Sequence, residues 1–310
     1  MPVNVLFAAR PERWVDYEAP LRAALAKADI EAHLSMEISP KEVDYIVYAP
    51  NSTLQDFTPY VRAKAVLNLW AGVEQITGNQ TLQIPLARMV DPGLTQGMVE
   101  WVCAHVLRYH LGLDADTKRS NAAWEPRQVP LAADRQIVVL GLGALGHAVA
   151  HALLGLGFRV AGWSRRAKTV QGVQCLSGED GLREALARAE ILVLLLPDTP
   201  GTENTLNTET LALMPRGAFV INPGRGPLID DGALIAALDA GQIANATLDV
   251  FRSEPLPPGD PYWAHPKVTV TPHIAAETRP STASEVIAEN IRRGEAGQPF
   301  LHLVDRAAGY

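Results

Sequence analysis

The chain has 310 residues, with 27 Lys and Arg against 34 Asp and Glu, so its formal charge is −7. Hydrophobic residues make up 47% of it and charged residues 20%, which is too apolar a balance for a disordered protein. The acidic excess argues against non-specific nucleic-acid binding, which needs Lys and Arg to neutralise phosphates. This length suggests two domains that bury enough surface to fold without a disulfide or a metal.

The two cysteines, Cys103 and Cys175, are far apart and follow no metal or redox spacing, so we expect reduced thiols in a cytoplasmic protein. The amino terminus has neither the charged region nor the long apolar region of a signal peptide. Residues 137–160 are numerous enough to cross a bilayer, but they contain five glycines and change from strand-like to helical spacing. We therefore predict a strand, a glycine turn and a helix there, and no membrane association.

The first hundred residues alternate short apolar runs with helical spacing. We predict strands at Val3–Ala9, Tyr45–Ala49 and Ala65–Leu69, and a helix at Pro20–Ala28. Such alternation is typical of a small parallel-sheet domain. A longer helix is predicted from Gln96 to Leu113, followed by an irregular, proline-containing segment from Thr117 to Arg135.

From Arg135 onwards, strands and helices alternate more regularly. The predicted strands are Ile137–Leu140, Arg159–Trp163, Ile191–Leu196, Ala218–Asn222, Ala246–Val250 and Val268–Thr271. The helices between them are Gly146–Leu156, Gly181–Ala189, Thr208–Leu213 and Asp231–Ala240. Continuous apolar runs such as 191–196 suit strands covered on both faces, as in a doubly wound parallel sheet. We expect the last helix, Ser281–Arg293, and the tail to return to the first domain.

A glycine motif follows the first strand of this second pattern. Gly141, Gly143 and Gly146 match G-x-G-x-x-G between a strand and a helix. In that context the glycines permit a tight turn, a close approach to a pyrophosphate and close helix packing, and the helix N-terminus favours the anion. The predicted dinucleotide contacts are Gly141, Leu142, Gly143, Ala144, Leu145 and Gly146.

The next strand ends in a basic segment. Ser164 occupies the position where NAD-selective proteins usually carry an acidic residue, and Arg165 and Arg166 follow it. Two guanidinium groups suit the 2′-phosphate of NADPH. We therefore predict that NADPH is preferred over NADH.

Three candidate catalytic residues follow late strands of the second pattern. Arg225 lies in a glycine-flanked turn, Glu254 lies just past the next strand, and His273 lies just past the last one. Ligands bind beyond the carboxyl ends of strands in open α/β sheets, so these side chains can converge. Arg225 would stabilise negative charge on a carbonyl that accepts hydride and bind a carboxylate, and His273 would donate the proton. Glu254 would orient the imidazole and favour its protonated form.

Together these segments resemble the D-isomer-specific 2-hydroxyacid dehydrogenase family over essentially the whole chain. The motifs that carry the resemblance are the glycine loop at 141–146, NPGRG at 222–226, LDVF-x-x-EPL at 248–256 and TPHIAA at 271–276. DPGLTQGMVEWV at 91–102, WSRR at 163–166 and the ending VDRAAGY are most similar to the glyoxylate/hydroxypyruvate reductase A group. This resemblance implies an NADPH-dependent cytoplasmic homodimer that reduces glyoxylate to glycolate and hydroxypyruvate to D-glycerate.

The resemblance also implies residue roles and a domain layout. It implies two Rossmann/flavodoxin-like parallel-sheet domains in an α/β fold: a discontinuous substrate-binding domain (1–98 and 276–310) and an NAD(P)-binding Rossmann domain (99–275). The implied substrate loop comprises Trp70, Ala71, Gly72 and Val73, with Trp70 departing from the smaller residues usual there. Further implied cofactor contacts are Leu196, Pro197, Pro223, Asp249 and His273. The dimer would form through the cofactor domain and place Arg119–Pro126, including Trp124, near the partner's active site.

Two alternatives to this function remain at the level of sequence. One is a dehydrogenase for a bulkier 2-oxo acid, since pocket volume depends on loop geometry. The other is a non-catalytic dinucleotide-sensing protein of the same fold, because a fold alone does not establish catalysis. If the protein is the predicted reductase, we expect a small-molecule substrate and no metal.

Overall fold

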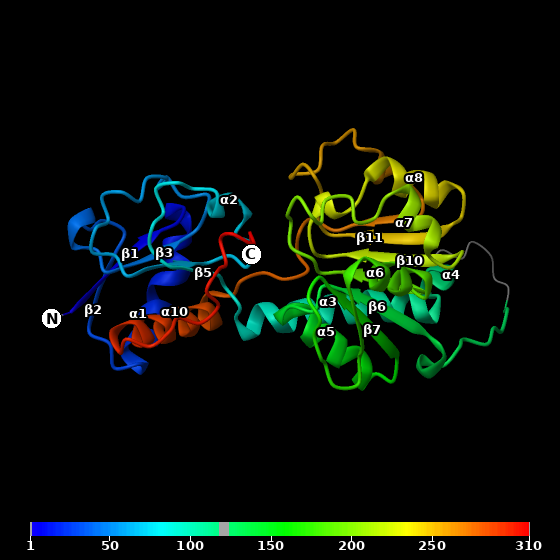
Figure 1. Cartoon of the computed structure of the whole chain (residues 1–310), viewed down its shortest axis with the longest axis horizontal. Helices are drawn as coiled ribbons and strands as arrows, with labels where there is room; N and C mark the ends of the chain where they lie inside the picture. Colours follow the sequence, from blue (N-terminus) through cyan, green and yellow to red (C-terminus); the bar gives the residue numbers. More distant parts are fainter. Residues whose placement is uncertain (1, 118–123, 310) are drawn as a thin grey trace. The chain divides into compact units, whose positions relative to one another are not determined.

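The computed structural model describes residues 2–117 and 124–309, and the chain divides into two compact units (Figure 1). Unit 1 consists of Met1–Leu94 and Glu277–Tyr310, and unit 2 consists of Thr95–Ala276. Each unit has its own parallel sheet, one of five strands and one of seven. The predicted α/β fold, with one domain assembled from both ends of the chain, is confirmed.

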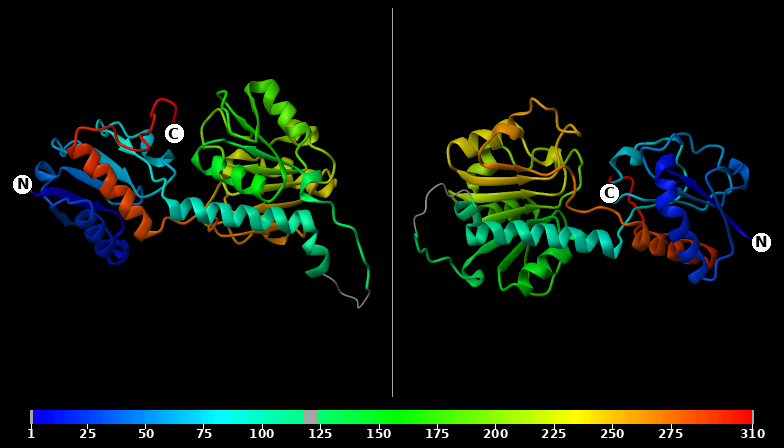
Figure 2. Two further views of the ribbon diagram at one scale, coloured as in Figure 1. Left: turned by 90° about the horizontal axis from the view of Figure 1, so that it is seen from below. Right: turned by 180° about the vertical axis from the view of Figure 1, so that it is seen from behind.

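The sheet of unit 1 has the strand order β2-β1-β3-β4-β5, with every neighbouring pair parallel, which is the flavodoxin-like order. Its strands are β1 (Val3–Ala8), β2 (Ala32–Ser35), β3 (Tyr45–Tyr48), β4 (Ala65–Asn68) and β5 (Leu86–Ala87). Its helices are α1 (Trp14–Lys27), α2 (Glu74–Thr77) and α10 (Pro280–Glu295). The blue α1 and the red α10 pack side by side although they come from opposite ends of the chain (Figures 1 and 2).

Successive side chains of a strand point to opposite faces of this sheet, and both faces are covered. Val5 and Phe7 of β1 join the cluster that contains Leu21 of α1 and Ile287 of α10. Leu6, between them, points to the opposite face and joins a second cluster. Both faces are therefore buried, so the strands read as continuous apolar runs rather than as alternating ones.

The sheet of unit 2 has the order β12-β11-β10-β9-β6-β7-β8, again with parallel pairs throughout. Its strands are β6 (Gln136–Leu140), β7 (Arg159–Ser164), β8 (Gln174–Ser177), β9 (Ile191–Leu194), β10 (Ala218–Asn222), β11 (Ile243–Leu248) and β12 (Val268–Val270). Its helices are α3 (Pro92–Leu111, begun at the end of unit 1), α4 (Leu113–Thr117), α5 (Ala144–Gly155), α6 (Gly178–Ala187), α7 (Thr208–Leu213), α8 (Asp231–Asp239) and α9 (Pro261–Ala264). The chain order reverses between β6 and β9, which is the switch point where ligands bind in such sheets.

Several helix boundaries differ from the predicted ones. Helix α1 begins at Trp14, so Pro20 lies inside the helix rather than at its first turn. Helix α3 begins at Pro92 instead of Gln96, because the buried Asp91 accepts the backbone N–H of Gly93 and of Leu94 through Oδ1. It ends at Leu111, where Gly112 takes a positive φ of 66°.

The stretch 137–160 folds as predicted, with β6 followed by a turn and α5. No helix within residues 2–117 and 124–309 combines the length and hydrophobicity that a membrane crossing requires.

Candidate active site

The glycine loop after β6 is shaped by three glycines with different roles. Gly141 has a φ of 103°, and a Cβ on it would lie 2.4 Å from the Leu195 carbonyl oxygen. A Cβ on Gly146 would lie 1.8 Å from the Gly141 oxygen, so the start of α5 can approach the loop only with glycine there. Gly143 caps α5, and apart from the residues adjacent to it in the chain, no described residue has an atom within 4 Å of the position of its absent Cβ. The open space before the free amides of α5 fits a pyrophosphate.

The other predicted dinucleotide contacts surround this loop. Leu142 is buried against Gly162 of β7, whereas Ala144 is exposed at the first position of α5. Leu145 packs partly into the core, Leu196 and Pro197 follow β9 across the switch point, and Pro223 is buried after β10. The loops after β6 and β9 therefore form one edge at the switch point.

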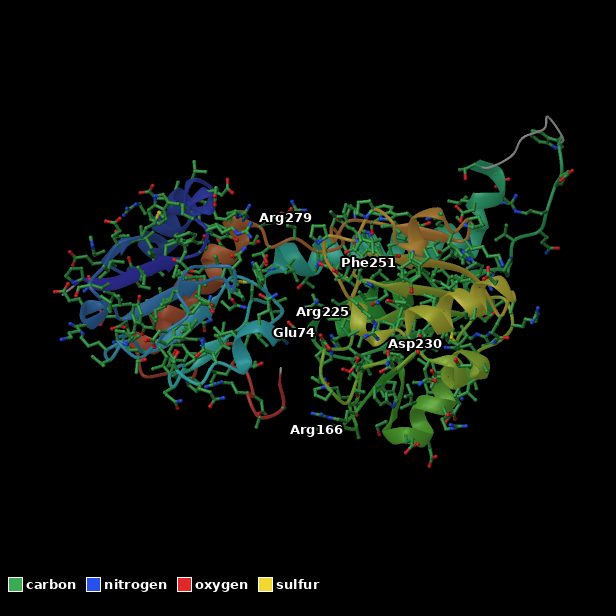
Figure 3. The ribbon with its side chains drawn as sticks, turned by 90° about the horizontal axis from the view of Figure 1, so that it is seen from above. Glu74, Arg166, Arg225, Asp230, Phe251 and Arg279 are labelled. Atoms are coloured by element: carbon green, nitrogen blue, oxygen red, sulfur yellow. The ribbon has the colours of Figure 1, made fainter. Side chains whose placement is uncertain are left out.

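The basic segment after β7 lies at the surface of unit 2. Ser164 ends β7, and its hydroxyl donates to the Arg166 carbonyl at 2.8 Å. The side chains of Arg165 and Arg166 are exposed, and Figure 3 shows Arg166 at the periphery of unit 2. Lys168 donates from Nζ to the Leu142 carbonyl of the glycine loop at 2.7 Å, so the segment is tied to that loop. No carboxylate occurs between residues 164 and 170.

Arg225 follows β10 in a turn organised by Asn222. The buried Asn222 accepts the Gly224 amide through Oδ1 at 3.1 Å and donates from Nδ2 to the Arg225 carbonyl at 2.9 Å. Arg225 also donates from Nη1 to the Gly224 carbonyl at 2.7 Å. These bonds fix the backbone from which the guanidinium extends.

A continuous set of contacts links the Arg225 turn to Glu254 and His273. A Cβ on Gly226 would lie 2.0 Å from the Phe251 carbonyl carbon, so the turn packs directly on the segment after β11. Figure 3 shows Arg225 and Phe251 at the same edge of unit 2. The Phe251 amide donates to Glu254 Oε1 at 2.9 Å, and His273 Nδ1 donates to Glu254 Oε2 at 2.7 Å. The structure thus brings the loops that carry the three predicted catalytic residues together.

The Glu254–His273 pair shifts both titrations toward the charged forms. The hydrogen bond to Glu254 raises the pKa of His273, more than burial and the nearby Arg225 lower it. For Glu254, burial raises the pKa, but the hydrogen bonds from His273 and the Phe251 amide outweigh it and lower the pKa overall. His273 Nε2 has no hydrogen-bond partner in the described part of the chain, so it can face a reactant.

Asp249 holds the loop that presents His273. It is 0% exposed, and its Oδ1 accepts from the Thr271 hydroxyl and the Ile274 amide while Oδ2 accepts from the Ala275 amide. His273 itself has a φ of 53°, an uncommon conformation for a non-glycine residue that surrounding contacts must maintain. Sequence reasoning gave Asp249 only a cofactor contact and missed this role. A buried carboxylate needs hydrogen-bond partners. The position of Asp249 at the end of a buried strand was therefore the sequence signal that could have indicated its role.

The predicted substrate loop belongs to unit 1 and follows β4. Asn68 is buried and donates from Nδ2 to the carbonyls of Trp70 and Gly72, at 2.9 and 3.0 Å. The indole of Trp70 is partly buried against the core of unit 1, and Val73 caps α2. The hydrogen bonds from Asn68 thus hold this predicted substrate loop in a turn. The three predicted catalytic residues lie in unit 2.

Comparisons with known proteins agree with this fold and motif pattern. Residues 102–275 match the family described as D-isomer specific 2-hydroxyacid dehydrogenase, NAD binding domain. The glyoxylate/hydroxypyruvate reductase A of Yersinia enterocolitica is 37% identical, covering 94% of each chain.

Two solved structures extend the similarity over the whole chain. One is a D-isomer specific 2-hydroxyacid dehydrogenase from Xanthobacter autotrophicus in complex with NADPH and MES, with a TM-score of 0.91, 40% identity and 100% coverage of both chains. The other is an NADPH-dependent glyoxylate/hydroxypyruvate reductase from Sinorhizobium meliloti in complex with NADP and sulfate, with a TM-score of 0.85, 33% identity and coverage of 100% of this chain and 99% of that one.

Proposed function

This chain belongs to the D-isomer-specific 2-hydroxyacid dehydrogenase family, and we propose that it is an NADPH-dependent reductase of small 2-oxo acids. The proposed reactions convert glyoxylate to glycolate and hydroxypyruvate to D-glycerate. The observation that carries the proposal is the 2.7 Å bond between His273 and Glu254, with His273 Nε2 left available beside the Arg225 turn. The names of the Yersinia and Sinorhizobium relatives support the choice of substrates.

The proposed mechanism assigns one task to each residue. Bound NADPH supplies a hydride to the 2-oxo carbon. Arg225 binds the substrate carboxylate and stabilises the negative charge that develops on the carbonyl oxygen, and His273 donates the Nε2 proton to that oxygen to complete the hydroxyl. Glu254 orients the imidazole and keeps it protonated. Unit 1 serves as the substrate-binding domain, with the amides of the 70–73 loop on the carboxylate, and unit 2 serves as the cofactor-binding domain.

A substrate panel separates this proposal from its alternatives. We expect NADPH oxidation with glyoxylate and hydroxypyruvate at a higher kcat/KM than with phenylpyruvate. A reversed order would assign the protein to bulkier 2-oxo acids. Tight NADPH binding without turnover of any 2-oxo acid would instead favour a dinucleotide sensor.

The proposed NADPH preference depends on the basic segment after β7. The Arg165→Ala/Arg166→Ala variant should lose affinity for NADPH far more than for NADH, because only NADPH carries the 2′-phosphate that pairs with guanidinium groups. Titration of both cofactors by fluorescence measures this. The Arg183→Ala/Arg188→Ala variant removes the same charge from an exposed position on α6 and a half-buried position next to it, and serves as the control. Equal losses for the two cofactors would contradict the proposal.

The proposed acid role of His273 predicts the pH dependence of reduction. The proton must be on His273 before transfer, so kcat/KM falls as pH rises through its raised pKa. In Glu254→Gln the cause of the raised pKa is removed, and the descending limb of the profile should move to lower pH. A limb that stays in place would show that another group sets it.

We also propose a homodimer formed through unit 2, with the segment after α4 reaching the partner. Trp124 is 92% exposed and Leu131 is 73% exposed, and both would gain from burial. Of the segment Arg119–Pro126, residues 119–123 lie outside the described part of the chain. The free thiols Cys103 and Cys175 fit the cytoplasmic location that we propose.

A further inference from the structure

Arg88 lies at the same sheet edge as the 70–73 loop. Strand β5 pairs in parallel with β4, with Leu86 beside Val66 and Ala87 beside Leu67, so the residues after both strands leave the sheet together. The Arg88 amide donates to the His302 carbonyl at 3.0 Å, and the next amide, that of Met89, donates to the Trp70 carbonyl at 3.0 Å. The backbone of Arg88 is therefore fixed against the substrate loop.

The side chain of Arg88 is partly buried, yet its guanidinium makes no hydrogen bond within residues 2–117 and 124–309. Burial lowers its pKa, and the charge of Glu74 opposes this effect. Glu74 is the first residue of α2 and directly follows the 70–73 loop (Figure 3), so this charge comes from the residue next to that loop. The Arg88 charge also reinforces the lowering of the His302 pKa by burial.

A partly desolvated guanidinium without hydrogen-bond partners is costly, because its five N–H donors lose water without replacement. Such a group reduces the stability of the fold unless a ligand accepts hydrogen bonds from it. Residues of this kind are typical of binding sites. Its planar donor fork suits an oxygen acceptor such as a hydroxyl or a carboxylate. Arg225 and the loop amides already serve the C1 carboxylate in the proposed function, so the remaining oxygen is on C3.

We propose that Arg88 binds the oxygen-bearing substituent on C3 of the substrate and thereby selects 3-hydroxylated 2-oxo acids. This inference rests on the proposed reductase function. Hydroxypyruvate carries the required hydroxyl group, pyruvate replaces it by hydrogen, and glyoxylate has no C3. The wild-type enzyme should therefore prefer hydroxypyruvate to pyruvate at least tenfold in kcat/KM.

The test compares Arg88→Met with the wild type on these three substrates. Methionine keeps much of the apolar stem but removes the donors, so the hydroxypyruvate-to-pyruvate ratio of kcat/KM should fall about tenfold or more, as expected for one hydrogen bond from a charged donor. The hydroxypyruvate-to-glyoxylate ratio should fall with it. Arg88→Lys keeps the charge without the fork and should give an intermediate ratio. Arg22→Met, at an exposed arginine of α1 paired with Glu18, is the matched control.

Thermal unfolding provides a second readout. Arg88→Met breaks no side-chain hydrogen bond among the described residues, so its Tm should equal or exceed that of the wild type. Ratios that stay within twofold of the wild type, or equal losses on all three substrates, would overturn the inference while leaving the reductase function intact. If the wild type reduces none of the three, the proposed function fails and this inference fails with it.

Discussion

Replacing His273 with alanine should lower kcat for glyoxylate and hydroxypyruvate by about 10²–10⁴-fold, the range typical of a lost general acid. The KM should change much less, because Arg225 and the loop amides, not the imidazole, hold the substrate carboxylate in this mechanism. Steady-state kinetics with saturating NADPH measure both constants. Within the described part of the chain, the His273 imidazole forms a hydrogen bond only with Glu254, so the fold should survive the substitution.

A second histidine–carboxylate pair in unit 2 provides the control. His265 Nε2 lies 3.3 Å from Asp239 Oδ1, and it follows α9 rather than the last strand. His265→Gln should keep kcat near the wild-type value. An unchanged kcat in His273→Ala would refute the acid role, and a loss of the same size in His265→Gln would show that the effect is not specific to the site.

Replacing Asp249 with asparagine should have the largest effect on stability. The amide keeps an oxygen for Thr271 and Ile274 but places N–H donors against the Ala275 amide, which is buried. An unsatisfied buried donor costs about 1–3 kcal/mol, and the facing donors add repulsion, so the free energy of unfolding should fall by about 3 kcal/mol. Urea unfolding measures this. Because the same loop presents His273, kcat should fall as well.

Thr271→Val gives a graded comparison for this prediction. It removes only the hydroxyl bond to Asp249 Oδ1, so the free energy of unfolding should fall by about 1 kcal/mol. Equal stabilities of Asp249→Asn and the wild type would mean that the carboxylate does not support the loop. A destabilised Asp249→Asn with full kcat would separate the stability of the loop from the position of His273.

The sequence predicts the elements whose patterns are local and strong. The run at 191–194 is buried on both faces, so its composition alone indicates a central strand. The glycines at 141 and 146 are required by backbone contacts, and the motif reports those contacts directly. Strands β2 and β8 escape prediction because they are edge strands that contain polar residues and have few buried positions, and β5 escapes because it has only two residues.

The residues of the candidate site also differ in whether the sequence could predict their roles. Arg225, Glu254 and His273 can be predicted because each follows a recognisable strand and belongs to a motif. The roles of Asp249 and Arg88 could not be predicted, since they depend on which loops meet. Asp249 is defined by hydrogen bonds to a loop more than 20 residues away, and Arg88 by the pairing of β5 with β4. Neither relation leaves a periodic signal in the sequence.

The proposed reaction reduces a 2-oxo acid with NADPH, and His273 protonates the resulting oxygen. The most direct test incubates the protein with hydroxypyruvate and NADPH, follows nicotinamide absorbance, and resolves the product by chiral chromatography. One D-glycerate should form for each NADPH consumed, and the rate should collapse in His273→Ala. No NADPH consumption, or a product that is L-glycerate, would contradict it.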